Sequence, residues 1–153
     1  MPSARLAKFC TKGSVWWVAD SALNMPPDSS RTVVHDGRPV VVVSTDLKNQ
    51  DRAFPVVSVC PISTSEARQF ATQYDLHLDR GEGNLSNESW VRTTLIQPMD
   101  KDKLDDYKGK LNDNRILELD DLIIDYLGML SADDDNYSSA VPSPFPKPGP
   151  FGI

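Results

Sequence analysis

The stretch that decides the fold lies in the first third of the chain and contains two runs rich in Val and Trp. The first reads GSVWWV at residues 13–18, and the second reads GRPVVVVS at residues 37–44. β-branched and aromatic residues favour extended strands, whose successive side chains point to opposite faces. Similar runs follow between turn residues, and the predicted strands are Ser14 to Ala19, Pro39 to Ser44, Pro55 to Ile62, Tyr74 to Leu78 and Ser89 to Gln97. Five strands at this spacing predict a mainly β fold, either a small barrel or a strongly twisted sheet.

The segment between the first two predicted strands, residues 20–37, is polar and contains prolines. It is too long for a hairpin turn, and loops of this length in a compact domain are often functional or mobile. We therefore expect it to act as a lid or a binding loop.

Helical spacing of apolar residues appears after residue 98. Leu104, Tyr107 and Leu111 fit one or two helical turns. An amphipathic helix is then predicted from the apolar residues Leu119, Leu122, Ile123, Tyr126, Leu127 and Leu130. Its polar face carries Asp120, Asp121 and Asp125, the first two near the predicted N-terminus of the helix, and Gly128 lies near its end. Residues 131–153 are acidic and then proline-rich, which predicts a disordered tail.

Bulk composition limits the class of protein. A chain of 153 residues with such a tail has room for one core. The net charge of −6 disfavours a nucleic-acid binder, but residues 1–50 carry six Lys and Arg against four Asp and Glu, which leaves room for a cationic face there. No run approaches the roughly 18 to 20 apolar residues of a membrane helix, and the N-terminus lacks a secretory signal, so we expect a cytoplasmic protein without a membrane anchor. Two cysteines without CxxC spacing predict neither a disulfide framework nor a zinc site, and Cys60 is expected in the core.

The two opening runs and several later signals together resemble the MazF/PemK family of toxin endoribonucleases. Members typically carry Gly-[Asp/Glu]-Val-x-Trp-Val in the first strand and an Arg-Pro run ending in Ser in the second. Further signals follow here in the family's order: VCPIST at residues 59–64 resembles the third strand, and LIQ at residues 95–97 resembles the Leu-x-x-Gln strand. Residues 103–128 resemble the family's ending, a Leu-containing turn and a helix that closes on Leu-Gly.

The resemblance implies an SH3-like small barrel with a C-terminal helix, a homodimer as the active unit, and metal-independent cleavage of single-stranded RNA. No cofactor is implied, and the natural partner is a cognate antitoxin protein. The toxin domain is expected at residues 12–130, after an N-terminal extension at residues 1–11 and before the tail.

The residue types also fit this chemistry. RNA supplies its own nucleophile, the 2′-OH, so the protein needs groups that assist proton transfer and positive charge on the pentacoordinate phosphate. Arginine suits the phosphate because its fixed donors match phosphoryl oxygens. In its Gly-Arg-Pro context Arg38 matches the family's catalytic Arg, and Ser63 lies where the catalytic Thr is expected, with Thr64 as the alternative under a one-residue shift.

Residues expected to bind RNA are Lys12, Trp17, Arg31, His35, Lys48, Asn49 and Gln97. In a two-fold dimer, Arg38 and the basic residues Lys12, Arg31 and Lys48 of both subunits are expected to line one groove, with the acidic helix elsewhere. The loop before Arg38 departs from the family, because TVVHD at residues 32–36 replaces a Ser-Glu-Gln-like segment. Retained catalysis and base preference depend on what replaces that segment.

Each candidate also has a purely structural interpretation. Arg38 could pair with Asp20 or Asp36, and Ser63 has the spacing to Glu66 of a helix-capping box. His77 is expected to face solvent on a strand. Trp16 and Trp17 point to opposite faces of their strand, so at least one belongs to the core.

Two other functions fit the same fold. A gyrase-inhibiting binding toxin of the CcdB type acts through an aromatic-Gly-Ile C-terminus, and this chain ends in Phe151-Gly152-Ile153. A catalytically inactive MazF-like module that only binds or regulates is the third hypothesis, suggested by the unusual loop and the acidic composition.

Overall fold

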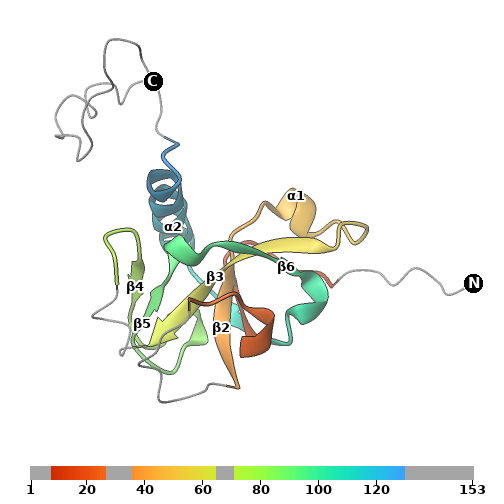
Figure 1. Ribbon diagram of the computed structural model, residues 1–153, viewed down its shortest axis with the longest axis horizontal. Helices are drawn as coiled ribbons and strands as arrows, with labels where there is room; N and C mark the ends of the chain where they lie inside the picture. Colours follow the sequence, from red (N-terminus) through yellow and green to blue (C-terminus); the bar gives the residue numbers. More distant parts are fainter. Residues whose placement is uncertain (1–7, 27–35, 65–70, 130–153) are drawn as a thin grey trace, which may run out of the picture.

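The computed structural model describes residues 8–26, 36–64 and 71–129. Its strands are β1 (Ser14–Ala19), β2 (Gly37–Val42), β3 (Val56–Thr64), β4 (Leu76–Leu78), β5 (Ser89–Val91), β6 (Gln97–Asp100) and β7 (Asp106–Lys110). Its helices are α1 (Asp46–Asn49) and α2 (Asp113–Tyr126), and its 3-10 turns are η1 (Asp20–Ala22), η3 (Glu82–Asn84), η4 (Thr93–Leu95) and η5 (Lys101–Lys103). The strands form one curled antiparallel sheet with α2 beside it (Figure 1). The predicted mainly β fold with a C-terminal helix is confirmed.

The sheet curls around its longest strand, β3. The strand order is β4-β5-β3-β2-β1-β7, and β6 is an additional partner of β3. The first half of β3 pairs with β6, from Val56 opposite Asp100 to Val59 opposite Gln97, and its last three residues pair with β5. One strand therefore belongs to two parts of the sheet, which brings β4 and β5 round toward α2.

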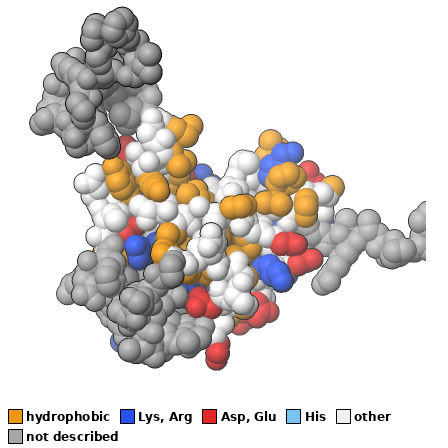
Figure 2. All heavy atoms as spheres, in the orientation of Figure 1, with side chains coloured by type: hydrophobic (Ala, Val, Ile, Leu, Met, Phe, Trp, Pro, Cys, Tyr) orange, Lys and Arg blue, Asp and Glu red, His pale blue; other side chains and the backbone are white. Residues whose placement is uncertain are grey.

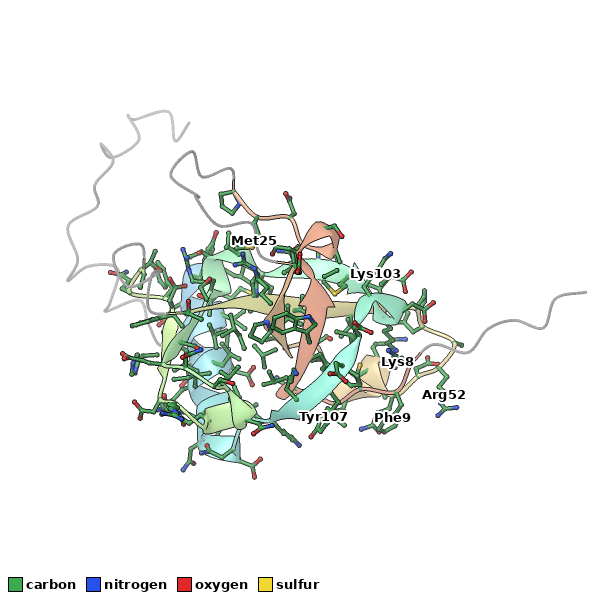
Figure 3. The ribbon with its side chains drawn as sticks, turned by 90° about the horizontal axis from the view of Figure 1, so that it is seen from below. Lys8, Phe9, Met25, Arg52, Lys103 and Tyr107 are labelled. Atoms are coloured by element: carbon green, nitrogen blue, oxygen red, sulfur yellow. The ribbon has the colours of Figure 1, made fainter. Side chains whose placement is uncertain are left out.

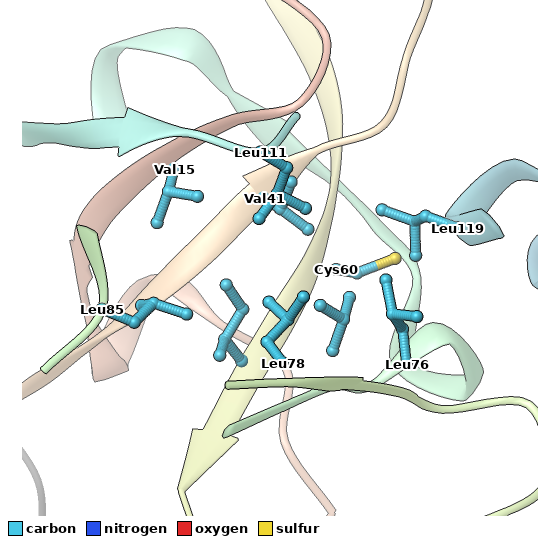
Figure 4. Close-up of a cluster of buried hydrophobic side chains, with 10 residues drawn as sticks. Val15, Val41, Cys60, Leu76, Leu78, Leu85, Leu111 and Leu119 are labelled. Atoms are coloured by element: carbon cyan, nitrogen blue, oxygen red, sulfur yellow. The ribbon is translucent and has the colours of Figure 1, made fainter. Parts of the chain in front are cut away.

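Alternation along the strands divides the core into two clusters. The first cluster, drawn in Figure 4, lies on the α2 side of the sheet and contains Val15, Val41, Cys60, Ile62, Leu76, Leu78, Leu85, Val91, Leu111 and Leu119. The second lies on the other face and contains Cys10, Val18, Leu23, Val40, Val42, Val57, Val59, Met99 and Leu104. Burying one Val or Leu side chain stabilises the fold by about 1.5–3 kcal/mol, so both clusters are needed to offset the loss of chain entropy.

The N-terminal residues that the structure describes pack on the second cluster. Cys10 is buried in it, and Lys8 donates a hydrogen bond from Nζ to the Leu104 carbonyl (Figure 3). The Lys8 ammonium also lies 5.6 Å from the centre of the Trp16 ring, which meets Tyr107 edge-on. Described residues of the predicted extension are thus attached to the barrel.

Helix α2 is confirmed, but it begins earlier than the apolar pattern predicts. Asn112 caps its N-terminus by accepting a hydrogen bond from the Arg115 amide, and Gly128 follows its end with a φ of +70°. Asp120 and Asp121 therefore lie in the middle of the helix rather than near its N-terminus. The acidic residue of the first turn is Asp113.

Two predicted elements are wrong. The run from Ser89 to Gln97 is not one strand, because η4 separates β5 from β6. At this turn the Thr93 hydroxyl donates to the Tyr74 carbonyl, and the Thr93 amide donates to the Asp75 carboxylate. The predicted helical turns around Tyr107 are instead strand β7, which pairs with β1. Tertiary pairing prevails there over the helical spacing, and Leu104 and Leu111 enter different core clusters.

The predicted loop is described only at its two ends, since residues 27–35 lie outside the described ranges, as does the predicted tail. Within those ranges no helix is long and apolar enough to cross a membrane.

Candidate catalytic site

Arg38 lies near the start of β2, opposite Val18 of β1, and only 8% of the residue is exposed. Its Nε donates a 2.7 Å hydrogen bond to Oδ1 of Asp20, the first residue of η1. Of the two structural partners considered from the sequence, the ion pair is therefore with Asp20. The contact uses Nε alone, so the two Nη groups of the guanidinium can bind another acceptor.

The strand register indicates which hydroxyl of β3 is nearest Arg38. β2 and β3 pair with Val42 opposite Val59, Val41 opposite Cys60 and Val40 opposite Pro61, where the pairing ends. The same register extended by two residues would set Arg38 opposite Ser63. Opposed residues of antiparallel strands project from the same face, and their Cα atoms lie about 4.5–5.5 Å apart.

Core packing gives the same assignment of faces without the extrapolated register. Val40 and Val42 point into the second cluster, so Arg38 is on that face of β2. Val57 and Val59 point into the second cluster too, which places Ser63 on the same face by alternation. Thr64 then projects from the opposite face, and the geometry favours Ser63 over Thr64 as the hydroxyl near Arg38.

The row continues across two further strands. Ser63 pairs with Trp90 of β5, and Trp90 pairs with His77 of β4. The rings of Trp90 and His77 meet edge-on with centres 5.1 Å apart, and His77 Nε2 lies 2.7 Å from Oε1 of Glu88. The sequence indicates that His77 alternates with apolar neighbours, but it gives no sign that His77 and Trp90 share a row with Arg38.

Trp17 is the exposed member of the tryptophan pair. It is 37% exposed, and Lys108 Nζ lies 5.6 Å from its ring centre. The ring lies against Gly37, where an added Cβ would come within 2.6 Å of the indole Nε1. Trp17 thus lies beside the residue that precedes Arg38, while Trp16 packs against the second cluster as expected of a core residue.

Lys12, Lys48 and Asn49 are not brought to Arg38 within one protomer. Lys12 precedes β1, whereas Arg38 is near the other end of that strand, and an extended chain rises about 3.3 Å per residue. The Lys12 ammonium is bound 2.8 Å from the carboxylate of Asp120, so the acidic helix lies beside Lys12, contrary to the expectation that it lies elsewhere. Among the described residues visible in Figure 2, basic side chains lie among acidic ones and form no continuous cationic surface.

Asn49 has a structural environment. It is 1% exposed, its amide donates to the Ser44 carbonyl and the Asp46 carboxylate, and its carbonyl oxygen accepts from the Ser44 hydroxyl. The neighbouring Lys48 lies over the ring of Phe54, 5.1 Å from its centre. The Asn49 side chain therefore organises its own turn, and its polar atoms are occupied.

The Gln97 side chain binds the backbone at the beginning of the long loop. Its Oε1 accepts from the Asn24 amide at 2.8 Å, and its Nε2 donates to the Asn24 carbonyl at 3.2 Å. One side chain thus binds the backbone of Asn24 as a neighbouring strand would. Arg31, His35 and Glu66 lie outside the described residues, so the capping box remains a prediction, although Ser63 itself belongs to β3.

Cys60 belongs to the core, as the sequence predicts. Burial raises the pKa of its thiol to about 12, with a smaller contribution from the Asp75 carboxylate. Burial also raises the pKa of Cys10. Neither thiol is available as a nucleophile at neutral pH.

A curled antiparallel sheet with a C-terminal helix, and an arginine on the same face as the Ser63 hydroxyl of the neighbouring strand, define a small β-barrel-like protein with a candidate phosphate-binding site. The family model for the PemK-like, MazF-like toxin of type II toxin-antitoxin systems matches residues 11–127, and the chain belongs to this family. The search of curated proteins gave no match.

Solved structures show the same fold at low sequence identity. An endoribonuclease in complex with its cognate antitoxin from a mycobacterial species has a TM-score of 0.58 and 17% identity, over 80% of this chain and 98% of that one. MazF from the MazE-MazF complex of Deinococcus radiodurans has a TM-score of 0.58 and 14% identity, over 80% and 99% of the two chains. The Mycobacterium tuberculosis toxin MazF-mt6 has a TM-score of 0.55 and 15% identity, over 75% and 96%.

Proposed function

We propose that this protein is the toxin of a toxin–antitoxin pair and cleaves single-stranded RNA at specific sites without a metal ion, with Arg38 and Ser63 at the catalytic centre. The observation that carries the proposal is the placement of Arg38 and Ser63 on one face of neighbouring strands. Membership of the toxin family and the endoribonuclease fold neighbours support it.

The proposed reaction is an in-line attack of the ribose 2′-OH on the adjacent phosphorus. A 2′-O–P bond forms and the P–O5′ bond breaks, which leaves a 2′,3′-cyclic phosphate and a 5′-hydroxyl. The 2′-OH proton passes to a water molecule, and the departing O5′ receives a proton from water. The Nη groups of Arg38 bind the non-bridging oxygens as their charge grows, and the Ser63 hydroxyl hydrogen-bonds the departing oxygen.

Trp90 and His77 extend the site without joining the proton transfer. Strands in a sheet are about 4.8 Å apart, so His77, two strands from Ser63, lies roughly 10 Å from it. That distance is too long for a shared proton but suits contact with a neighbouring nucleotide. The His77 ring, which is partly exposed, can stack on an unstacked base, and the buried Trp90 ring supports it edge-on.

The proposed partners follow from the family and from the complexes that the fold neighbours form. Two of those neighbours are complexes with an antitoxin, and we propose a cognate antitoxin for this chain as well, together with a cytoplasmic site of action. A homodimer is part of the proposal because a two-fold partner presents the Arg38 face twice. Lys12 and Lys48, which lie away from Arg38 in one protomer, would reach the RNA through such an arrangement.

The test is cleavage of a long single-stranded RNA in EDTA, with the cut sites mapped by primer extension. We expect discrete cuts, 5′-hydroxyl products and a large loss of rate in Arg38→Ala. The matched control substrate carries one 2′-deoxy nucleotide at the cut site, and it should stay intact because the nucleophile is missing. Cleavage of that substrate, or activity unchanged in Arg38→Ala, would contradict the proposal.

The two rival functions remain distinguishable. The gyrase hypothesis rests on Phe151-Gly152-Ile153, which lie outside the described residues. Deleting them should leave RNA cleavage unchanged if the proposal holds. A chain that binds RNA or an antitoxin but cleaves nothing would instead fit the inactive module.

A further inference from the structure

We propose that Asp20 is a positioning residue that fixes the guanidinium of Arg38 in the orientation needed to bind the reacting phosphate. This inference rests on the proposed function. Asp20 acts through Arg38, because its carboxylate binds the Nε of that side chain.

The contact between the two side chains is short and shielded. Arg38 Nε and Asp20 Oδ1 lie 2.7 Å apart, and the side chains are 10% and 19% exposed. A charge-assisted hydrogen bond of this length, held away from water, restricts rotation of the guanidinium about its last side-chain bonds. The Asp20 carboxylate accepts from Nε, so the two Nη groups are left to bind a ligand.

The backbone holds Asp20 in place as well. Its amide donates to the Asp36 carbonyl at 3.1 Å, and its own carbonyl accepts from the Leu23 amide at 3.1 Å. The first bond joins η1 to Asp36, the residue before β2, directly beside the pairing of Ala19 with Gly37. The second bond closes the turn of η1 itself. The carboxylate is thus fixed to the same end of the sheet that carries Arg38.

A fixed arginine changes the chemical step more than substrate binding. A guanidinium free to rotate still attracts RNA by its charge, but it spends less time aligned with the oxygens on which charge develops. Loss of an interaction made only in the transition state lowers kcat and leaves KM nearly unchanged. For Asp20→Ala we expect kcat to fall roughly 10- to 100-fold with KM within about twofold. Asp20→Asn keeps an acceptor oxygen and should recover most of that loss.

The chain offers a matched control pair. Arg115 Nε lies 2.7 Å from Oε1 of Glu82, and the two side chains are 23% and 22% exposed. Arg115 lies on α2 and Glu82 on η3, away from the Arg38 row. Glu82→Ala likewise removes a carboxylate from an arginine Nε, although Glu82 also accepts from Nη2 of Arg115 at 3.0 Å, and Nη1 keeps its hydrogen bond to Glu118. If loss of such a pair acted only through stability, both variants would change thermal stability and neither would change kcat.

The decisive experiment is a double-mutant cycle measured by single-turnover cleavage on the full chain. Asp20→Ala should lower the rate in the wild-type background and change it by less than about twofold in the Arg38→Lys background, because its effect requires the guanidinium. An equal loss in both backgrounds, or a loss matched by Glu82→Ala, would overturn the inference.

A second readout separates this inference from the proposed function. In the nitrogen–proton NMR spectrum of the arginine side chains, the Nε proton of Arg38, assigned from its absence in Arg38→Lys, should exchange slowly with water and become fast in Asp20→Ala. The corresponding proton of Arg115 should stay unchanged. If the wild-type protein cleaves no RNA, the proposed function fails, and fast exchange already in the wild type would overturn the positioning role separately.

Discussion

Lys12 Nζ binds the carboxylate of Asp120 at 2.8 Å, which joins the start of β1 to the middle of α2. Both side chains are about one-third exposed, at 30% and 32%. Ion pairs of this kind contribute at most about 1 kcal/mol because water and salt screen them.

We therefore predict that Lys12→Met lowers the free energy of unfolding by less than about 1 kcal/mol, and that the loss shrinks at high salt. Urea denaturation at two salt concentrations measures this. In a double-mutant cycle with Asp120→Asn the two losses should not add. Full additivity would show that the ion pair carries no coupling energy.

Lys101 makes a stronger structural contribution. It is fully buried, and its ammonium donates to the carbonyls of Lys48 at 2.7 Å and Asp51 at 3.0 Å. Lys101→Met keeps most of the length of the side chain but removes the charge-assisted hydrogen bonds to both carbonyls, which retain only their backbone donors, the Asp51 and Phe54 amides. We expect destabilisation of about 1–3 kcal/mol in urea denaturation. Lys103→Met, in the exposed part of the same turn, should change stability by less than about 0.5 kcal/mol.

Cys60 should resist alkylation while the protein is folded. With a pKa of about 12, roughly one thiol in 10,000 is ionised at pH 8, and the side chain has no exposed surface. Labelling with iodoacetamide, followed by mass spectrometry, should proceed only at the rate of unfolding. Rapid labelling in native buffer that disappears in Cys60→Ala would show that the first core cluster opens locally.

The strands are predictable from sequence because β-branched runs dominate β1, β2 and β3, and most residues of β2 and β3 are buried on both faces. β7 is not predictable in this way, because DYKGK has little apolar character and is a strand only through its pairing with β1. The candidate site divides similarly. Arg38 and Ser63 are found from local motifs, whereas Asp20 as the partner of Arg38, and Trp90 and His77 as its row, depend on the register between distant strands.

Glu82 predicts a dependence of stability on acid. The hydrogen bond from Arg115 holds the pKa of its carboxyl below the ordinary value of 4.5, against a smaller opposing effect of burial. A lowered pKa in the folded state stabilises the fold above the unfolded-state value, and that contribution is lost as pH falls through the folded-state value. The difference in unfolding free energy between wild type and Glu82→Gln should thus be constant near neutral pH and shrink below about pH 4.5. A difference that grows on acidification would contradict the assigned direction.

The choice between Ser63 and Thr64 gives the sharpest functional prediction. Adjacent residues of a strand project to opposite faces, and Ser63 shares the face of Arg38 through both the register and the second core cluster. Ser63→Ala should lower the single-turnover cleavage rate by roughly 100- to 1,000-fold, the usual cost of removing one hydrogen-bond donor to an oxygen on which charge develops, while Thr64→Ala changes it by less than about threefold. Ser63→Thr keeps the hydroxyl and adds one methyl group, so it should retain most of the activity. The two alanine variants lie side by side at the end of β3, so thermal denaturation of both controls for damage to the strand. If Thr64→Ala proves the more damaging at equal stability, the register of β2 and β3 does not extend to Arg38, and the hydroxyl of the site must be assigned to Thr64 instead.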